Sequence, residues 1–186
     1  MNRKTLIYGT LAVVIIAIIA AIGLANRNAV PNAASQAPMQ SKLKVGDTAP
    51  EFKVDTNAGP FDLASVQTPV LLEVFATWCP HCQHETVILN DLATKYQGKI
   101  AMVAVSGSPY GMDGSSPESL ADVNTFGQTF RVRYPLAFDP QLTVGQQYLL
   151  GGYPTIVLIK PDKKIAFLKD GEIPEADLVK AINGVL

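Results

Sequence analysis

Blocks of hydrophobic and polar positions along the chain predict an alternation of strands and helices. The segments 70–77 and 99–106 are short, nearly continuous apolar runs, which is typical of strands buried on both faces of a sheet. Between them, apolar side chains recur every three or four residues from 82 to 96, and Gly98 follows. This spacing predicts an amphipathic helix with one inward face, which ends at the glycine.

The remainder of the domain continues this alternation. Near its start, FKVDT and FDLAS flank the turn residues 57–59 and predict a β-hairpin. The later predicted elements are a loop to Ser116, a helix at 117–130, a short strand at 136–138, a helix from about 142, a hairpin of strands 155–159 and 164–169, and a closing helix from Pro174. This order predicts an α/β fold in which helices cover a mixed sheet around one core.

The N-terminal part of the chain has a different pattern. Residues 6–25 form an uncharged apolar run, as long as a helix that crosses a bilayer. Arg3 and Lys4 precede the run, which favours a cytoplasmic N-terminus at 1–5 and a domain outside the cytoplasm. We therefore predict a single-pass signal anchor in the cell membrane. A cleaved signal peptide is an alternative, although its apolar region is usually shorter, about 7–15 residues; a buried core helix is another.

Charge separates the two segments that follow the apolar run. Residues 26–44 contain two prolines and no acid, which is typical of a flexible linker. Residues 45–186 contain ten Lys and Arg against sixteen Asp and Glu, a net charge of −6. This length suffices for one domain with its own core. Because an acidic domain lacks the basic surface that nucleic acid requires, we predict no nucleic-acid binding.

Both cysteines and both histidines of the chain lie in the stretch ATWCPHCQHE, residues 76–85. Cys79 ends a buried strand, and Pro80 suits the first turn of the helix that follows. The Cys79 sulfur is thus expected at a helix N-terminus, where free N–H groups and the helix dipole stabilise a thiolate. His81 adds a positive charge beside it when protonated. Cys82 lies one turn further on the same side and can resolve a mixed disulfide formed at Cys79.

Two other interpretations of this stretch are open. A purely structural disulfide would restrain almost nothing in the unfolded chain, because the loop between the cysteines is so short. The four N and S ligands could also indicate a metal. However, ligands within a turn and a half of one helix cannot all converge on a tetrahedral ion, and the chain has no other Cys or His. We therefore predict a redox-active pair, Cys79 and Cys82, and no metal site.

Three motifs resemble the thioredoxin superfamily: FATWCPHC, VGDTAPEF at 45–52 and GGYPTIVLI at 151–159. Together they are most similar to membrane-anchored, extracytoplasmic thioredoxin-like proteins of the TlpA/ResA type, which are AhpC/TSA-redoxin-like. The resemblance covers roughly residues 43–186. It implies a thioredoxin fold with an N-terminal β-hairpin and a central insertion, and thiol–disulfide oxidoreductase activity.

The resemblance also implies roles for individual residues. Cys79 would attack and Cys82 would resolve. Pro154 matches a proline that takes a cis peptide bond beside the site, where the bend can offer backbone groups to an extended substrate. Without the resemblance, a trans proline at the start of a strand is an equal alternative. Tyr153 is bulkier than the usual Thr or Val and bears on substrate fit. Trp78 is expected to pack over the site as a platform.

Two acidic residues are candidates for proton transfer. Glu73 interrupts the first buried strand, where thioredoxins carry a buried Asp. Burial would raise the pKa of Glu73 and make it a plausible acceptor for the Cys82 proton. The alternative is an exposed position on a less buried strand. Glu85 shares the Cys82 face of the helix, where proteins of the TlpA/ResA type often have Glu, but an ordinary first-turn acid explains it equally well. His84 projects away from that face and is expected at the surface.

These features predict a membrane-anchored, extracytoplasmic thiol–disulfide oxidoreductase that acts on exported protein substrates. The Pro-His pair between the cysteines resembles DsbA-type disulfide donors, whereas the whole chain resembles TlpA/ResA-type reductants; we favour the reductant. Either direction requires a membrane or extracytoplasmic redox partner that resets the dithiol. No cofactor is predicted.

Two further classes share parts of this pattern. Many peroxiredoxins also open with GDTAPEF, but their peroxidatic cysteine lies in P-x-x-x-T-x-x-C. Here Thr77 is two residues before Cys79, and Leu72 stands where the proline would be. Copper-binding modules of the Sco type share the fold and the anchor, but they use C-x-x-x-C with a distant His, and no His follows His84.

Overall fold

The computed structural model describes residues 41–186. The predicted anchor at 6–25 and the linker up to residue 40 lie outside the described residues. Within the described part, no helix has the length and apolar character needed to cross a membrane. Residues 41–44, the end of the predicted linker, have no regular secondary structure, and the Ser41 N–H donates to the Leu149 carbonyl at 2.5 Å.

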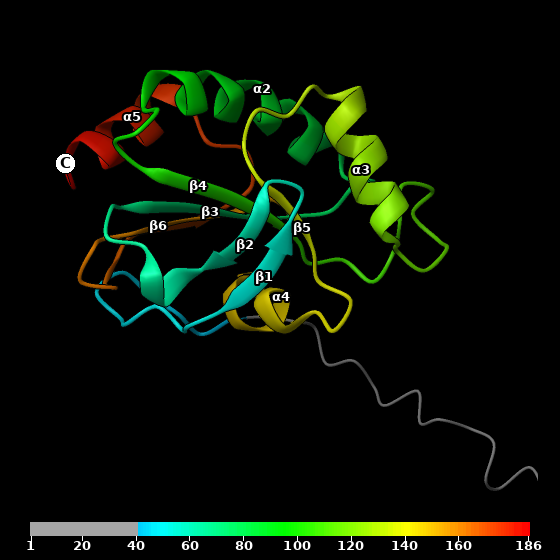
Figure 1. Ribbon diagram of the computed structural model, residues 1–186, viewed down its shortest axis with the longest axis horizontal. Helices are drawn as coiled ribbons and strands as arrows, with labels where there is room; N and C mark the ends of the chain where they lie inside the picture. Colours follow the sequence, from blue (N-terminus) through cyan, green and yellow to red (C-terminus); the bar gives the residue numbers. More distant parts are fainter. Residues whose placement is uncertain (1–40) are drawn as a thin grey trace, which may run out of the picture. The chain divides into compact units, whose positions relative to one another are not determined.

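Seven strands form one mixed sheet in the order β2-β1-β5-β4-β3-β6-β7 (Figure 1). They are β1 (Lys53–Thr56), β2 (Gly59–Asp62), β3 (Val70–Phe75), β4 (Ala101–Ser106), β5 (Leu136–Phe138), β6 (Thr155–Ile159) and β7 (Ile165–Asp170). The predicted N-terminal hairpin is β1-β2. Strand β3 lies inside the sheet, parallel to β4 and antiparallel to β6, and all of its residues are buried, as its apolar composition predicted.

Helices cover both faces of this sheet. The described helices are the short 3-10 helix η2 (Leu63–Ser65) and the α-helices α2 (Pro80–Lys95), α3 (Leu120–Thr129), α4 (Thr143–Tyr148) and α5 (Glu175–Asn183). Helices α2, α3 and α5 pack on one face, and α4 packs on the other (Figure 1). The structure therefore has the predicted α/β architecture.

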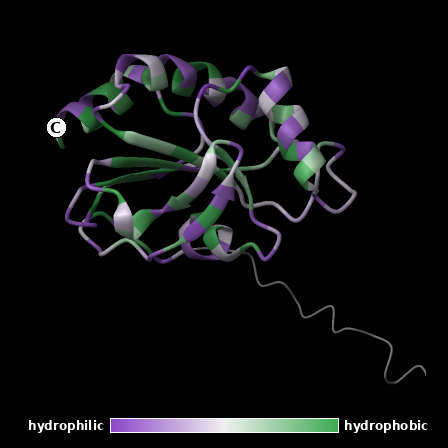
Figure 2. Cartoon of the chain, in the orientation of Figure 1, coloured by the Kyte–Doolittle hydropathy of each residue, from purple (hydrophilic) through white to green (hydrophobic). Residues whose placement is uncertain are grey.

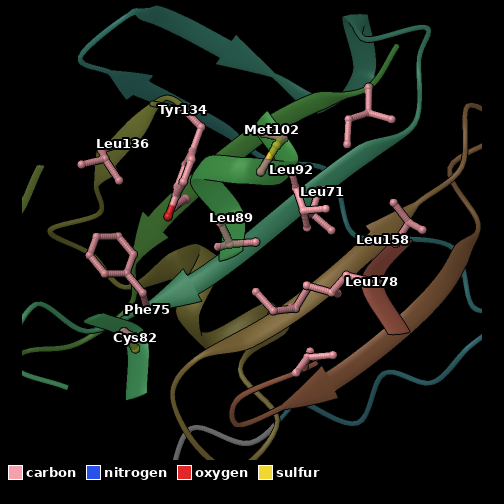
Figure 3. Close-up of a cluster of buried hydrophobic side chains, with 14 of the residues drawn as sticks. Leu71, Phe75, Cys82, Leu89, Leu92, Met102, Tyr134, Leu136, Leu158 and Leu178 are labelled. Atoms are coloured by element: carbon pink, nitrogen blue, oxygen red, sulfur yellow. The ribbon is translucent and has the colours of Figure 1, made fainter. Parts of the chain in front are cut away.

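Strand β3 contributes side chains to two hydrophobic cores, one on each face. Leu71 and Phe75 belong to the core under α2 and α5 (Figure 3), whereas Leu72 and Val74 belong to the core that α4 closes. The central strands are accordingly rich in hydrophobic residues (Figure 2). Because side chains alternate along a strand, Glu73 lies on the same face as Leu71 and Phe75, beneath α2.

Local capping moves two predicted helix boundaries. The helix predicted at 117–130 begins at Leu120 because Ser119 caps it: the Ser119 hydroxyl accepts from the Asp122 N–H, and the Asp122 carboxylate accepts from the Ser119 N–H. The closing helix begins at Glu175, with Pro174 at its cap position. Strand β5 and helix α4 lie where the short strand and the following helix were predicted.

Candidate active site

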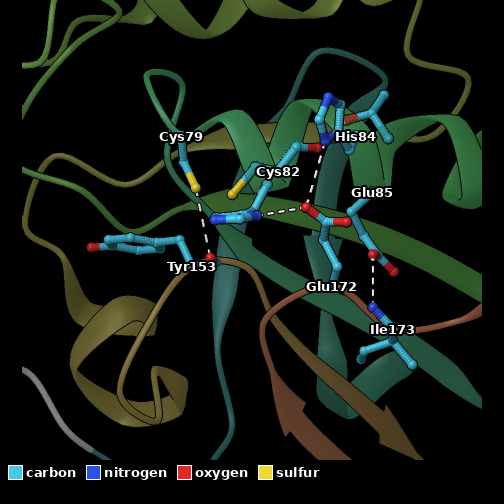
Figure 4. A network of polar contacts seen from close by, with 9 residues as sticks. Cys79, Cys82, His84, Glu85, Tyr153, Glu172 and Ile173 are labelled. Atoms are coloured by element: carbon cyan, nitrogen blue, oxygen red, sulfur yellow. Dashed lines mark hydrogen bonds and ion pairs between the residues drawn. The ribbon is translucent and has the colours of Figure 1, made fainter.

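Cys79 lies at the junction between β3 and α2, as the N-cap residue of the helix, and Pro80 follows it in the first turn. Its sulfur faces the Tyr153 carbonyl at 3.6 Å (Figure 4). The pKa of Cys79 is lowered to about 6, first by a hydrogen bond from the Cys82 thiol and then by the backbone N–H groups of Cys82 and His81. At neutral pH the Cys79 sulfur is therefore mainly a thiolate, the nucleophilic form.

Cys82 lies in the first turn of α2, three residues after Cys79, and is fully buried. Burial raises its pKa, and so do its hydrogen bond to Cys79 and the charge of Glu73. Both cysteines are free thiols in this structure. The pair is thus asymmetric: a thiolate at the helix N-terminus and a neutral thiol beneath it, which must lose its proton before it can attack.

Glu73 is 3% exposed and points into the core under α2. The Tyr134 hydroxyl donates to its Oε2 at 3.3 Å, and Oε1 has no hydrogen-bond partner among the described residues. Burial raises the pKa of Glu73 to about 8, with smaller contributions from the charges of Glu85 and Cys79. The alternative of an exposed position on the strand is therefore wrong, and Glu73 is a neutral acid at pH 7.

Glu85 lies one turn after Cys82 on α2 and is also fully buried. Its Oε2 accepts a hydrogen bond from the Ile173 N–H at 3.0 Å (Figure 4). Burial raises its pKa to about 7. An ordinary solvated first-turn acid does not fit this environment. Two buried carboxyl groups, rather than one, thus lie on the Cys82 side of the site.

Two aromatic residues and a cis proline border the Cys79 sulfur. The Tyr153–Pro154 peptide bond is cis, as the motif implied. Trp78 is 36% exposed, and its ring makes an edge-on contact with Tyr153, with 5.9 Å between the ring centroids. The Trp78 Nε1–H donates to the Ser108 hydroxyl at 2.8 Å, and the Tyr153 hydroxyl donates to the Gly107 carbonyl at 2.7 Å. Both rings are therefore anchored to the loop after β4.

Sequence reasoning missed Glu118, which lies in that same loop. Its Oε1 accepts from the Thr77 hydroxyl at 3.0 Å, and its Oε2 accepts from the buried Ser106 hydroxyl. Burial raises the pKa of Glu118 to about 7. In the sequence, Glu118 is surrounded by serines and a proline. An acidic residue in such a segment is expected to be exposed to solvent in a loop. The contact of Glu118 with Thr77 joins the loop to the turn that carries Cys79.

Sequence reasoning also missed Glu172, in the loop between β7 and α5. The Nδ1 atoms of His81 and His84 lie 2.5 and 3.5 Å from its Oε1 (Figure 4). The pKa of His81 is raised by its hydrogen bond to Glu172 and by the charge of that carboxylate. His84 is at the surface, as predicted, with a side chain that is 76% exposed. Within residues 41–186, no group of three or more His, Cys, Asp or Glu is arranged to hold a metal ion.

This geometry suits thiol–disulfide exchange. A stabilised thiolate can act as a nucleophile, and a buried second thiol one turn away can act as a resolving group. Two buried carboxyl groups with pKa values near neutrality are suited to exchange protons with that second thiol. The cis-proline loop places a backbone carbonyl next to the nucleophile.

Known proteins resemble this chain in sequence and in structure. Residues 45–168 match the AhpC/TSA family. The chain is 30% identical over 149 residues to the thiol-disulfide oxidoreductase ResA of Oceanobacillus iheyensis, covering 76% of this chain and 73% of the relative. A crystal structure from Chlorobium tepidum, provisionally assigned as the thiol:disulfide interchange protein DsbE, is similar at 25% identity and a TM-score of 0.68 over 77% of this chain and 99% of that one. The peroxidoxin BcpB of Mycobacterium tuberculosis is similar at 25% identity and a TM-score of 0.58, over 77% and 96% of the two chains.

Proposed function

The chain belongs to the AhpC/TSA family as a thioredoxin-like thiol–disulfide oxidoreductase of the TlpA/ResA type, and we propose that it reduces disulfide bonds of exported proteins from an anchored position outside the cytoplasm. The observation that carries the exchange chemistry is the asymmetric pair of thiols at the N-terminus of α2. The uncharged run at 6–25, preceded by Arg3 and Lys4, supports the anchor and the orientation.

Exchange would proceed in two displacements. The Cys79 thiolate attacks one sulfur of the substrate disulfide, forms a mixed disulfide and releases the other substrate sulfur as a thiolate. Cys82 then loses its proton and attacks the Cys79 sulfur, which releases the second substrate thiolate and leaves a Cys79–Cys82 disulfide. The substrate gains two electrons and the enzyme loses two, so a redox partner must reduce the enzyme again.

Proton transfer from Cys82 is the step for which the buried acids matter. Glu73 and Glu85 lie on the Cys82 side and are partly or wholly neutral near pH 7, with pKa values of about 8 and about 7. An acid with a pKa near the working pH exchanges protons most effectively, because both of its forms are available. We propose that the ionised form of either group accepts the Cys82 proton in the reductive direction, mainly Glu85 near pH 7 and Glu73 increasingly as the pH approaches 8.

The opposite direction, disulfide donation, has one specific observation in its favour. The pKa of Cys79 is lowered to about 6, and a stabilised thiolate favours the reduced form of the enzyme, which makes its disulfide a stronger oxidant. A glutathione redox titration of the full chain decides between the directions, followed through Trp78, the only tryptophan. A potential near about −270 mV or below supports the reductant, and one near about −120 mV supports the donor.

Insulin reduction tests the exchange chemistry itself. The chain has only two cysteines, so Cys79→Ser and Cys82→Ser are matched variants. We expect Cys79→Ser to abolish insulin reduction, and Cys82→Ser to accumulate a mixed disulfide at Cys79 that a gel without reductant reveals. Retained activity in Cys79→Ser contradicts the proposal. Rapid peroxide consumption by the reduced enzyme, without insulin reduction, would favour a peroxiredoxin instead.

A further inference from the structure

The loop of residues 171–173, between β7 and α5, contacts two different parts of the site through its backbone. The Gly171 N–H donates to the Pro154 carbonyl at 2.8 Å, next to the cis peptide bond. The Ile173 N–H donates to the buried Glu85 carboxylate at 3.0 Å. Both ends of this three-residue loop are thus hydrogen-bonded to the site, which fixes the backbone position of the residue between them.

That residue is Glu172, and its side chain faces the start of α2. Its Oε1 is 2.5 Å from the His81 Nδ1, and the His84 Nδ1 lies at 3.5 Å from the same oxygen (Figure 4). His81 is one of the groups that stabilise the Cys79 thiolate, through its backbone N–H and through its charge. Glu172 is therefore connected to Cys79 through the imidazole of His81.

We propose that Glu172 is a positioning residue that holds protonated His81 beside the Cys79 thiolate and thereby stabilises the reduced enzyme. The carboxylate favours the charged imidazole, and the charged imidazole favours the thiolate. This inference rests on the proposed function for its consequence, a shift in the thiol–disulfide equilibrium, but its effect on Cys79 is measurable without any substrate.

Several titratable groups face His81 and must be considered together. Cys79 and His84 lie on its own helix, Glu172 lies opposite, and Glu85 lies buried near Glu172. The Glu172 charge also acts on Cys79 directly, and there its sign is opposite, because two negative charges repel each other. The direct contact of Glu172 is with His81, so we expect the favourable path through the imidazole to prevail.

The Glu172→Gln variant separates these effects. In the reduced full chain, the pH dependence of iodoacetamide alkylation at Cys79 reports the Cys79 pKa. We expect this pKa to rise, with the proton-binding constant of Cys79 increasing about two- to fivefold, the range expected for one exposed ion pair. The equilibrium with glutathione should shift by a similar factor toward the oxidised enzyme. A circular dichroism spectrum and thermal unfolding curve like those of the wild type confirm that the variant is folded.

Two variants serve as controls. Glu175→Gln removes the same charge three residues further on, where the carboxylate lies 4.0 Å from Lys95 instead of a histidine, and should leave the Cys79 pKa unchanged. In a His81→Gln background, Glu172→Gln should no longer raise the Cys79 pKa. The proposal is overturned if Glu172→Gln leaves this pKa unchanged, lowers it, or raises it equally when His81 is absent. A wild type that alkylates normally but fails to reduce insulin would contradict the proposed function alone.

Discussion

The buried Glu73 should make the free energy of unfolding of the reduced protein fall as the pH rises. Its replacement by glutamine should make this fall smaller. Glu73 is 3% exposed, and its pKa is raised from the ordinary 4.5 to about 8, mainly by burial. A carboxyl with a raised pKa binds its proton more tightly in the folded state than in the unfolded state. Its contribution to stability is complete below pH 4.5 and is lost as the pH rises toward 8.

The size of the effect follows from this pKa difference. Each pH unit between the unfolded and folded pKa values costs about 1.4 kcal/mol. Between pH 5 and pH 8, Glu73 should therefore lower the free energy of unfolding by about 3–4 kcal/mol, slightly less than three full units because the group is partly titrated at both ends of this range. Glutamine has a similar shape and does not titrate. Its amide adds a cost that is the same at every pH, so the slope rather than the absolute stability carries the information.

Urea unfolding of the reduced full chain, followed by Trp78 fluorescence, measures this slope at several pH values. Glu85 and Glu118 also have raised pKa values and add slopes of the same sign, so only the difference between wild type and Glu73→Gln isolates Glu73. Glu51→Gln removes an exposed carboxyl and controls for the change in net charge. Parallel curves for wild type and Glu73→Gln would refute the reasoning, because they would mean that Glu73 does not change its protonation on folding.

Two further variants test the packing around the site. Tyr134→Phe removes the hydrogen bond to the Glu73 carboxylate, so the pKa of Glu73 should rise further and the pH profile of insulin reduction should move upward, by about one unit at most. Tyr148→Phe, which removes a buried hydroxyl bonded to the Pro50 carbonyl, is the control and should leave the pH profile unchanged. An equal shift of the profile in both variants would exclude a specific role for Tyr134. Gly145→Ala places a Cβ 3.1 Å from the Gly107 backbone, where α4 crosses the end of β4, and should lower the free energy of unfolding by about 1–3 kcal/mol in urea titrations. Gly152→Ala is the matched control, because its Cβ would meet only Asp170, at 3.9 Å. An equal loss of stability in both variants would contradict the close contact at Gly145.

The positions of Glu73 and Glu85 could be predicted from the sequence, but their burial could not. The alternation of side chains in β3 and the helical spacing of α2 placed both acids on the Cys82 side. Whether either was buried depended on what packed above them, and the sequence left this open for both. The decisive neighbours are Tyr134, 61 residues from Glu73, and Ile173, 88 residues from Glu85. Local periodicity carries no information about contacts at such separations.

Features that depend on residues close together in the chain could be predicted from the amino-acid sequence. Apolar runs and helical spacing predicted the α/β elements, and Pro80 after Cys79 predicted a thiol at a helix N-terminus. The contacts of Glu118 with Thr77 and of Glu172 with His81, next to that thiol, arise only in the folded chain. The physical reason is that strand and helix propensities act over a few residues, whereas the desolvation and charge pairing that set a pKa depend on segments that the fold brings together from distant parts of the chain.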